Sequence, residues 1–208
     1  VHIKNGEVID GTGAPKFKSD IVINKGKIIG VFPAENGDVR DPSEDHFLSN
    51  FKAKHTINAE NKIISPGFID VHTHDDDNVF LDPSMSSKIS QGVTTCVAGN
   101  CGISLAPFSY KGEVPAPIAL LGKSEVFRFP RVSDYKEEFN NKPSSVNLAL
   151  LTGHSMLRVE AMNGEFARPA TTKEISKMVD KLKLALEDGS IGLSTGLAYP
   201  AANDAPTS

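Results

Sequence analysis

The sequence comprises 208 residues with a formal net charge of −4, and hydrophobic residues make up 39% of it. This composition excludes a wholly disordered chain, and the acidic balance argues against a nucleic-acid partner, which requires a basic face. The sequence contains no apolar run of about 18 residues and no signal-peptide pattern, so we expect neither a membrane span nor export.

Two cysteines, Cys96 and Cys101, lie close together in the sequence. In an extended segment this spacing separates their Cα atoms by about 16 Å, whereas a disulfide requires about 7 Å or less. We therefore expect two reduced thiols and a cytoplasmic protein.

Residues 1–62 predict a small N-terminal β domain, and its first 32 residues predict antiparallel strands. Asn5-Gly6 and Asn24-Lys25-Gly26 each stand between two apolar runs, which is typical of a β-hairpin because such turn residues accept positive φ angles. Gly11-Thr12-Gly13 also indicates a hairpin end rather than a dinucleotide loop, since no helix follows that would hold a phosphate. Residues 33–55 are polar and charged without a period, so we expect a loop or insertion there.

From residue 63 onward, the pattern alternates between buried strands and helices. Four apolar runs begin near residues 64, 93, 147 and 190. Buried strands separated by helices predict parallel βα units. A closed (β/α)8 barrel takes about 250 residues, whereas about 145 follow Ile63. We therefore expect residues 63–208 to form the first four βα units of an incomplete barrel.

The clearest predicted helix lies in TTKEISKMVDKLKLALEDG, residues 171–189. Thr171 and Glu174 match a capping box, and Gly189 occupies the position of a C-terminal glycine. Apolar residues recur at helical spacing and mark one face, namely Ile175, Met178, Val179, Leu182 and Leu186.

The stretch PGFIDVHTH, residues 66–74, places two histidines at the end of an apolar strand. Residues two apart on a strand share a face, and in a barrel that face lies at the C-terminal mouth, where such enzymes have their sites. His72 and His74 therefore form half of a candidate metal site, since neutral imidazole is a common zinc ligand. An isolated His-x-His pattern is more often a pair of surface histidines. Here Asp70, which shares the strand face of His72, and the acidic run after His74 favour a metal site.

Cys101 stands in the motif GNCG after the second predicted parallel strand. The flanking glycines allow the backbone to turn and to approach a metal closely, and a thiolate is a good zinc ligand. A free cysteine is as often a small buried hydrophobe, so the residues alone leave both roles open. Cys96 lies inside the strand and is assigned to packing.

Several polar side chains follow the third and fourth strands. His154 either lines the barrel mouth or supports the strand end through hydrogen bonds, and we favour the second role. Arg158 is either a carboxylate clamp or part of a local salt bridge. The hydroxyl of Tyr199 would donate to a substrate or to its own loop. Ser194 and Thr195 lack the Gly-x-Ser-x-Gly spacing of a nucleophile.

The order of these motifs resembles that of the amidohydrolase superfamily. The opening pattern is carried by IKNGEVIDGTG, DIVINKGKIIGV and INAENKIISPGFIDVHTH. The continuation resembles the D-aminoacylase branch, the N-acyl-D-amino-acid deacylases, through HTHDDD, KISQGVTTCVAGNCGISLAP, LTGHSMLR, RPATTKEISKMV and GSIGLSTGLAYPAA. The likeness covers almost the whole chain except residues 33–55 and 107–145.

The resemblance implies a small N-terminal β-sandwich joined to a zinc-dependent (β/α)8 barrel. It implies that His72, His74 and Cys101 bind metal, divided between a weak and a tight metal position, and that Tyr199 contacts the substrate. That substrate would be an N-acyl-D-amino acid, whose amide bond is hydrolysed to a carboxylate and a D-amino acid. The fourth strand has no lysine, which argues against relatives that bridge two metals with a carboxylated lysine. A cyclic amidase, such as a hydantoinase or dihydroorotase, and a non-catalytic barrel scaffold are the alternatives.

The resemblance also implies components that follow these 208 residues. The family takes two further histidine ligands and the general-base aspartate from later barrel strands, which places them beyond Ser208. We therefore expect the chain to be the N-terminal portion of a longer enzyme, or a truncated product, and to be inactive alone. The small-molecule substrate is the implied partner, and the oligomeric state is open.

Overall fold

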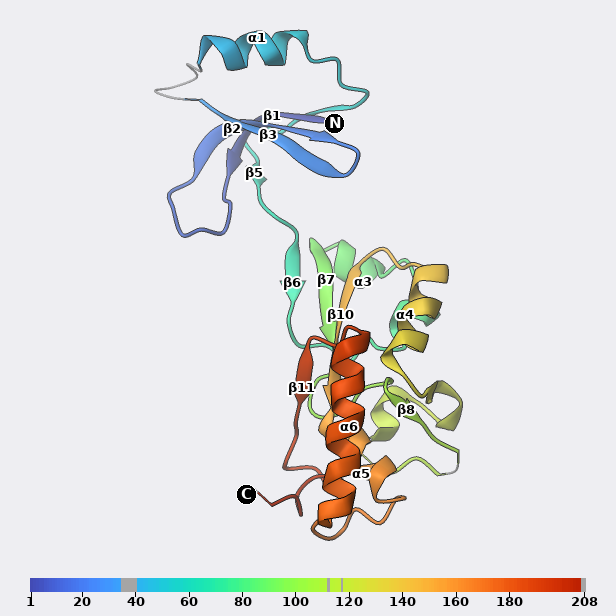
Figure 1. Ribbon diagram of the computed structural model, residues 1–208. Coiled ribbons are helices and arrows are strands. Elements are labelled where there is room, and N and C mark those ends of the chain that lie inside the picture. Colours follow the sequence, from blue (N-terminus) through green and yellow to red (C-terminus); the bar gives the residue numbers. More distant parts are fainter. Residues whose placement is uncertain (35–40, 112, 117, 207–208) are drawn as a thin grey trace. The chain divides into compact units, whose positions relative to one another are not determined.

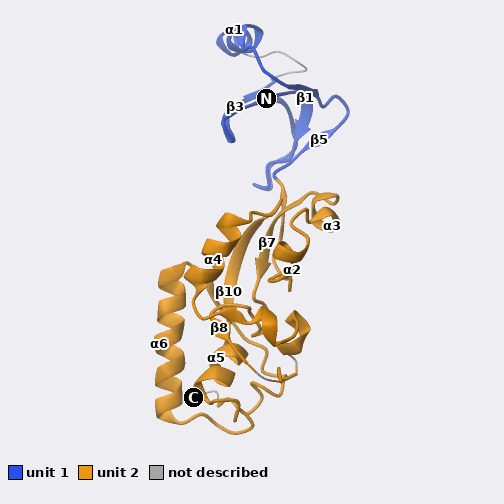
Figure 2. Cartoon of the chain, turned by 90° about the vertical axis from the view of Figure 1, so that its right-hand side faces the viewer, with its two compact units in different colours: residues 1–66 blue, residues 67–208 orange. Residues whose placement is uncertain are grey.

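The computed structural model describes residues 1–34, 41–111, 113–116 and 118–206 (Figure 1). The chain divides into two compact units, residues 1–66 and 67–208 (Figure 2). The division falls after Pro66 rather than after residue 62, because the short strand β5 (Ile63–Ile64) pairs with the first strand of unit 1. The predicted strand from Ile63 to the histidines is therefore two separate strands, one in each unit.

Unit 1 is a mixed sheet in which the strands of the first 32 residues are antiparallel, as expected. Its strands, besides β5, are β1 (His2–Val8), β2 (Phe17–Asn24), β3 (Lys27–Pro33) and β4 (Thr56–Asn58). The order is β3-β2-β1-β4, and β5 also pairs with β1. The first three strands run antiparallel, whereas β4 and β5 run parallel to β1.

One of the two asparagine-containing turns was predicted correctly. Lys25 and Gly26 join β2 to β3 with φ angles of 48° and 74°. The hairpin predicted at Asn5-Gly6 is wrong, since both residues lie inside β1, where the pairing register with β2 shifts. Asn5 has a φ of 63°, and a left-handed residue serves a β-bulge as well as it serves a turn.

The polar segment 33–55 is not entirely a loop. Residues 35–40 lie outside the described part of the chain, but Pro42–Asn50 form the helix α1. Asp41 caps this helix by accepting a hydrogen bond from the Ser43 amide at 2.8 Å, and proline occupies the first turn, as its fixed φ allows. Phe47 stacks on Phe32 of β3 with ring centroids 5.3 Å apart, which attaches the helix to the sheet.

Unit 2 contains the predicted parallel strands. They are β6 (Phe68–Asp70), β7 (Val93–Ala98), β10 (Asn147–Gly153) and β11 (Gly192–Ser194). All pair in parallel in the order β11-β10-β7-β6, which is the α/β arrangement expected for consecutive βα units. Their carboxyl ends meet at one edge of the sheet, so the segments that follow β6, β7, β10 and β11 are neighbours there.

Helices and a structured connection cover this sheet. The helices are α2 (Asn78–Leu81), α3 (Ser86–Ile89), α4 (Val132–Asn141), α5 (His154–Ala161) and α6 (Thr172–Asp188). The connection between β7 and α4 forms the ribbon of β8 (Phe108–Ser109) and β9 (Arg128–Phe129), with the 3-10 turns η1 (Ile118–Leu121) and η2 (Ser124–Val126). Its aromatic side chains pack into the core: Phe108 is fully buried and contacts the Phe127 ring edge to face.

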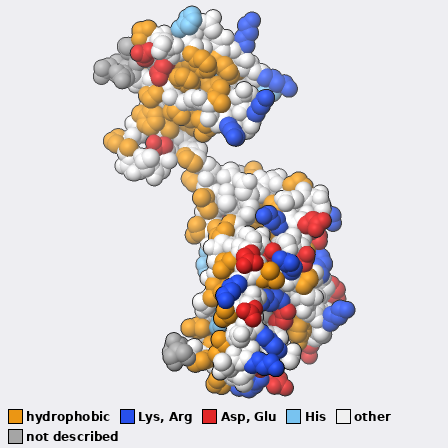
Figure 3. Space-filling model, viewed as in Figure 1, with side chains coloured by type: hydrophobic (Ala, Val, Ile, Leu, Met, Phe, Trp, Pro, Cys, Tyr) orange, Lys and Arg blue, Asp and Glu red, His pale blue; other side chains and the backbone are white. Residues whose placement is uncertain are grey.

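The long helix α6 has the predicted ends but a partly open apolar face. Thr171 and Glu174 form the capping box, and Gly189 closes the helix with a φ of 111°. Met178 is buried against α5, whereas Ile175 and Val179 are each 43% exposed and line an open groove of about 340 Å³. On the side of α6 shown in Figure 3, acidic and basic side chains alternate, as on a solvated surface.

Unit 1 also exposes hydrophobic side chains, which gather on the face shown in Figure 3. On β3, Ile28 is 64% exposed and Ile29 is 50% exposed. Among the helices that the structure describes, none is both long enough and apolar enough to cross a bilayer.

Candidate metal centre

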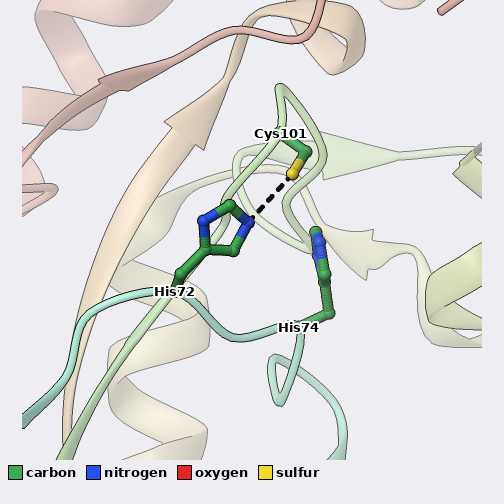
Figure 4. A group of neighbouring side chains, drawn as sticks. All are labelled: His72, His74 and Cys101. Atoms are coloured by element: carbon green, nitrogen blue, oxygen red, sulfur yellow. Dashed lines mark hydrogen bonds between the residues drawn. The ribbon is translucent and has the colours of Figure 1, made fainter.

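Three predicted metal ligands converge at the carboxyl edge of the parallel sheet (Figure 4). His72 and His74 lie in the segment just after β6, and Cys101 lies in the loop after β7. One ligand atom from each residue lies within 4.8 Å of the others. The Nε2 atom of His72 is 3.1 Å from the Cys101 Sγ atom, and the two imidazole centroids are 6.0 Å apart.

The backbone of the histidine segment is attached to the end of β7. The Thr73 amide donates to the Val97 carbonyl at 3.1 Å. Asn100 donates through its side-chain amide to the Thr73 carbonyl at 3.3 Å and to the Val97 carbonyl at 2.7 Å. Thr73, between the two histidines, is buried. The two imidazoles therefore project from a fixed backbone next to the cysteine loop.

The cysteine loop lies against the neighbouring strands in a conformation that requires its glycines. Gly99, Cys101 and Gly102 have φ angles of 78°, 57° and 78°. A Cβ atom on Gly99 would lie 2.1 Å from the Leu151 carbonyl oxygen of β10, which only glycine avoids. A left-handed φ is uncommon for a residue with a side chain, and such backbone conformations concentrate at functional sites.

Asp76, two residues after His74, supports the same loop from a buried position. It is fully buried, and its carboxylate accepts hydrogen bonds from the Gly99 amide at 3.3 Å and the Leu105 amide at 3.2 Å. Burial raises the pKa of Asp76 to about 7, although both amides favour the ionised form. In the sequence, the acidic run after His74 was a sign of a metal site. The run alone does not identify Asp76 as the aspartate that supports the cysteine loop.

Lys88 of α3 neutralises the carboxylates on either side of the histidines. Its Nζ atom lies 2.7 Å from Asp70 Oδ2 and 3.0 Å from Asp75 Oδ2. The hydrogen bond from Lys88 lowers the pKa of Asp70, which also accepts from the His72 amide at 3.3 Å. Asp70 is therefore engaged in holding the segment and is not a member of the ligand cluster.

The donor set fits a zinc ion. Burial, followed by the nearby charge of His72, lowers the pKa of His74, which keeps its imidazole neutral as a ligand must be. The Nδ1 atom of His74 is buried and has no hydrogen-bond partner in the described part of the chain. Tetrahedral zinc, with bonds of about 2.0 Å to nitrogen and 2.3 Å to sulfur, holds its ligand atoms about 3.5 Å apart. The spacing of the three side chains is compatible with that size.

The other predicted polar residues have different surroundings. His154 begins α5, outside the cluster of His72, His74 and Cys101, and burial lowers its pKa. Its buried Nδ1 atom has no hydrogen-bond partner among the described residues, so this atom does not give the support that we favoured.

Among the described residues, Arg158 pairs with no carboxylate, so neither the predicted clamp nor the predicted local salt bridge forms there. Arg158 is 1% exposed, and its guanidinium donates to the backbone carbonyls of Ala201, Phe166 and Arg168 at 3.0 Å each. The sequence pattern missed this role because the acceptors come from loops without a motif. Arg158 instead ties α5 to the segments before and after α6.

Tyr199 and Cys96 differ in how accessible they are. Tyr199 is half-buried, and its ring packs on Gly196, which in turn approaches the Cys101 carbonyl so closely that an added Cβ would lie 2.3 Å away. Tyr199 thus lies near the cysteine loop. Cys96 is a fully buried free thiol in the core, as predicted, and burial raises its pKa.

Comparison with known proteins agrees with the predicted resemblance. The model of the amidohydrolase family matches residues 55–207. An N-acyl-D-aspartate deacylase of Alcaligenes xylosoxydans xylosoxydans is 40% identical over 205 residues, which are 99% of this chain and 38% of that protein. A D-aminoacylase of the same organism is 39% identical over 206 residues, 99% of this chain and 39% of that protein.

Solved structures give the same result. The crystal structure of a D-aminoacylase superposes with a TM-score of 0.87 at 43% identity, over 99% of this chain and 40% of that one. The N-acyl-D-glutamate deacylase of Bordetella bronchiseptica, complexed with zinc and a phosphonate inhibitor, has a TM-score of 0.86 at 38% identity and the same coverage. The chain spans about 40% of the length of these relatives. It belongs to the amidohydrolase family, in the branch of D-aminoacylases and N-acyl-D-amino-acid deacylases.

Proposed function

We propose that this chain forms the metal-binding portion of an N-acyl-D-amino-acid deacylase. The reaction is hydrolysis of the amide bond to a carboxylate and a D-amino acid. The observation that carries the proposal is the convergence of His72, His74 and Cys101 within 4.8 Å. A non-catalytic scaffold needs neither the two imidazoles nor the thiol. Their presence together at one site therefore argues against a non-catalytic homologue.

His72, His74 and Cys101 would hold zinc. A zinc ion there supplies Lewis acidity, which polarises an amide carbonyl and lowers the pKa of water towards about 7. The protein keeps His74 neutral by burial, and it fixes the cysteine through the glycine loop. The chain therefore supplies a neutral His74 and a positioned Cys101 before any metal is bound.

We assign the substrate contact to Tyr199. Its phenol would donate a hydrogen bond to the substrate carboxylate or to the carbonyl as negative charge develops there. The ring is held by Gly196 and by the core, so the direction of the hydroxyl is set by packing. A rigid donor of this kind costs little entropy when substrate binds.

The carboxylates next to the two histidines already have structural roles. Asp70 and Asp75 pair with Lys88, and Asp76 is buried and accepts two backbone amides. We therefore assign the general base to none of the three. The proposal is that the 208-residue chain binds zinc in the cytoplasm without turning over substrate by itself.

A chimeric enzyme tests the proposed reaction. In it, residues 55–207 replace the matching segment of a D-aminoacylase, and hydrolysis of N-acetyl-D-methionine, N-acetyl-L-methionine and hydantoin is measured. We expect zinc-dependent hydrolysis of the D-substrate, with little activity on the other two. The same chimera carrying Cys101→Ser is the matched control and should lose the activity.

Two results would contradict the proposal. A folded chimera that opens hydantoin but leaves N-acetyl-D-methionine intact would indicate a cyclic amidase. A folded chimera without zinc and without activity would favour the scaffold. Turnover by the isolated 208-residue chain with bound zinc would contradict only the statement that the chain is inactive by itself.

A further inference from the structure

Ser194, which the sequence pattern excludes as a nucleophile, contacts both sides of Cys101. It is the last residue of β11, and it is 9% exposed. Its hydroxyl donates to the Gly99 carbonyl at 2.5 Å and accepts from the Gly102 amide at 3.0 Å. One side chain from a strand more than ninety residues away thus joins the two glycines that enclose the cysteine.

The cysteine loop needs such a contact. A left-handed φ is unfavourable for a residue with a side chain, and glycines add conformational freedom that a fixed ligand must lose. Cys101 has a φ of 57° between two such glycines. Without an external partner, the loop would sample other conformations, and Sγ would leave the neighbourhood of His72.

Other contacts also hold this loop, including those from the Asn100 side chain to the Thr73 and Val97 carbonyls. Asp76 accepts from the Gly99 and Leu105 amides, and the Gly102 carbonyl accepts from the Ser155 amide at 2.9 Å. Ser194 reaches one backbone group before Cys101 and one after it. The Ser194 hydroxyl donates its proton to the Gly99 carbonyl. The hydroxyl therefore holds the loop and does not act as a nucleophile.

We propose that Ser194 is a positioning residue that fixes the Cys101 thiolate for metal binding. This inference rests on the metal-binding role proposed for Cys101 and adds the residue that pre-organises it. Loss of a partner that orients a metal ligand typically weakens metal affinity by 10–100-fold. Because Ser194 acts through the backbone and not on the ligand atom itself, we expect the lower end, about tenfold.

Cobalt(II) titration of the purified metal-free protein tests the inference. A cobalt–thiolate bond gives a charge-transfer absorption that reports on Cys101 directly, and Cys101→Ser should abolish it. Ser194→Ala should bind cobalt about tenfold more weakly, with a weaker thiolate band. Ser190→Ala is the matched control, since Ser190 is also buried and its hydroxyl bonds Thr152 and the Leu150 carbonyl, outside the cysteine loop. It should keep the wild-type cobalt affinity.

The outcomes separate the inference from the proposed function. A wild-type thiolate band with an unchanged affinity in Ser194→Ala would overturn the positioning role alone. A wild-type protein without the band would overturn the metal site and, with it, the inference.

Hydrogen exchange of the wild-type protein provides a test that needs no variant, in case Ser194→Ala does not fold. The Gly102 amide should be protected before metal is added, because its partner is the buried Ser194 hydroxyl. Exchange at the rate of an unstructured peptide would overturn the inference.

Discussion

The Nε2 atom of His72 lies 3.1 Å from the Sγ atom of Cys101, although 29 residues separate them in the sequence. The contact arises because β6 and β7 are adjacent parallel strands whose carboxyl ends meet at one edge. The chain after β6 carries an imidazole and the chain after β7 carries a thiol. Neighbouring strands thus bring ligands together without any contact local in sequence.

Cys101→Ser should remove most of the zinc that the protein retains, because serine oxygen replaces the softest ligand of the set. Zinc content after dialysis of the purified protein measures this. Cys96→Ala is the matched control, since Cys96 is buried inside β7 and away from the ligands. It should lower stability but leave the zinc content unchanged. Equal zinc in Cys101→Ser and wild type would show that the thiolate is not a ligand.

Local patterns in the sequence account for much of the fold. The β-branched run at β7, the apolar run at β10 and the capping box of α6 were predicted because strand patterns and helix capping depend on residues near one another. The same local patterns failed at Asn5, where a left-handed residue makes a bulge and not a turn. They also missed α1, whose charged sequence obscured the Asp41 cap.

The candidate ligands could be predicted from sequence, but their supports could not. His72, His74 and Cys101 stand in recognisable short motifs. Ser194, by contrast, is on β11 and contacts the cysteine loop after β7, with β10 between these two strands, and Arg158 reaches carbonyls on irregular segments. Such contacts depend on strand order and loop path, which a single sequence does not determine. Residues that look neutral in a motif can therefore hold a site in place.

Lys88→Met should lower the free energy of unfolding by about 1 kcal/mol, the upper end for an exposed pair, because Lys88 is partly buried between two carboxylates. Urea unfolding measures the change. Lys142→Met is the matched control: Lys142 is 72% exposed and lies 3.8 Å from Glu138, so its loss should have no measurable effect. Equal effects of the two substitutions would show that the Asp70–Lys88–Asp75 group does not stabilise the fold.

Arg158→Lys should destabilise the protein by about 3 kcal/mol, because lysine cannot reach three carbonyls at once and leaves buried acceptors without donors. Arg128→Lys is the control at an exposed position, where the guanidinium pairs with Glu138 at 2.8 Å. It should change stability by less than about 1 kcal/mol. A small effect of Arg158→Lys in urea unfolding would mean that water enters and replaces the lost hydrogen bonds.

Tyr199→Phe tests the substrate contact in the active chimera. It removes the hydroxyl but keeps the ring on Gly196, so the melting temperature should stay close to that of the parent. The value of kcat/KM for N-acetyl-D-methionine should fall about tenfold or more, as expected for loss of about 1.4 kcal/mol of transition-state binding. An unchanged kcat/KM would assign Tyr199 to packing alone.

The capping box of α6 makes stability depend on pH through Glu174. The Arg168 guanidinium, at 2.8 and 3.0 Å, holds the pKa of Glu174 well below its ordinary value, and hydrogen bonds from the Thr171 amide and hydroxyl add to this. A lowered pKa in the folded state stabilises the fold above the unfolded-state pKa of about 4.3. That contribution is lost as the pH falls below it.

Glu174→Gln should therefore lower the melting temperature at pH 7, and the difference from wild type should shrink as the pH falls from 5 to 3. Thermal unfolding monitored by circular dichroism across this range measures the difference. Glu187→Gln, at an exposed position in the last turn of the same helix, controls for the loss of one negative charge. A difference between Glu174→Gln and wild type that stays constant with pH would mean that the neutral cap is as good as the ionised one, and that the Arg168 pair contributes nothing to folding.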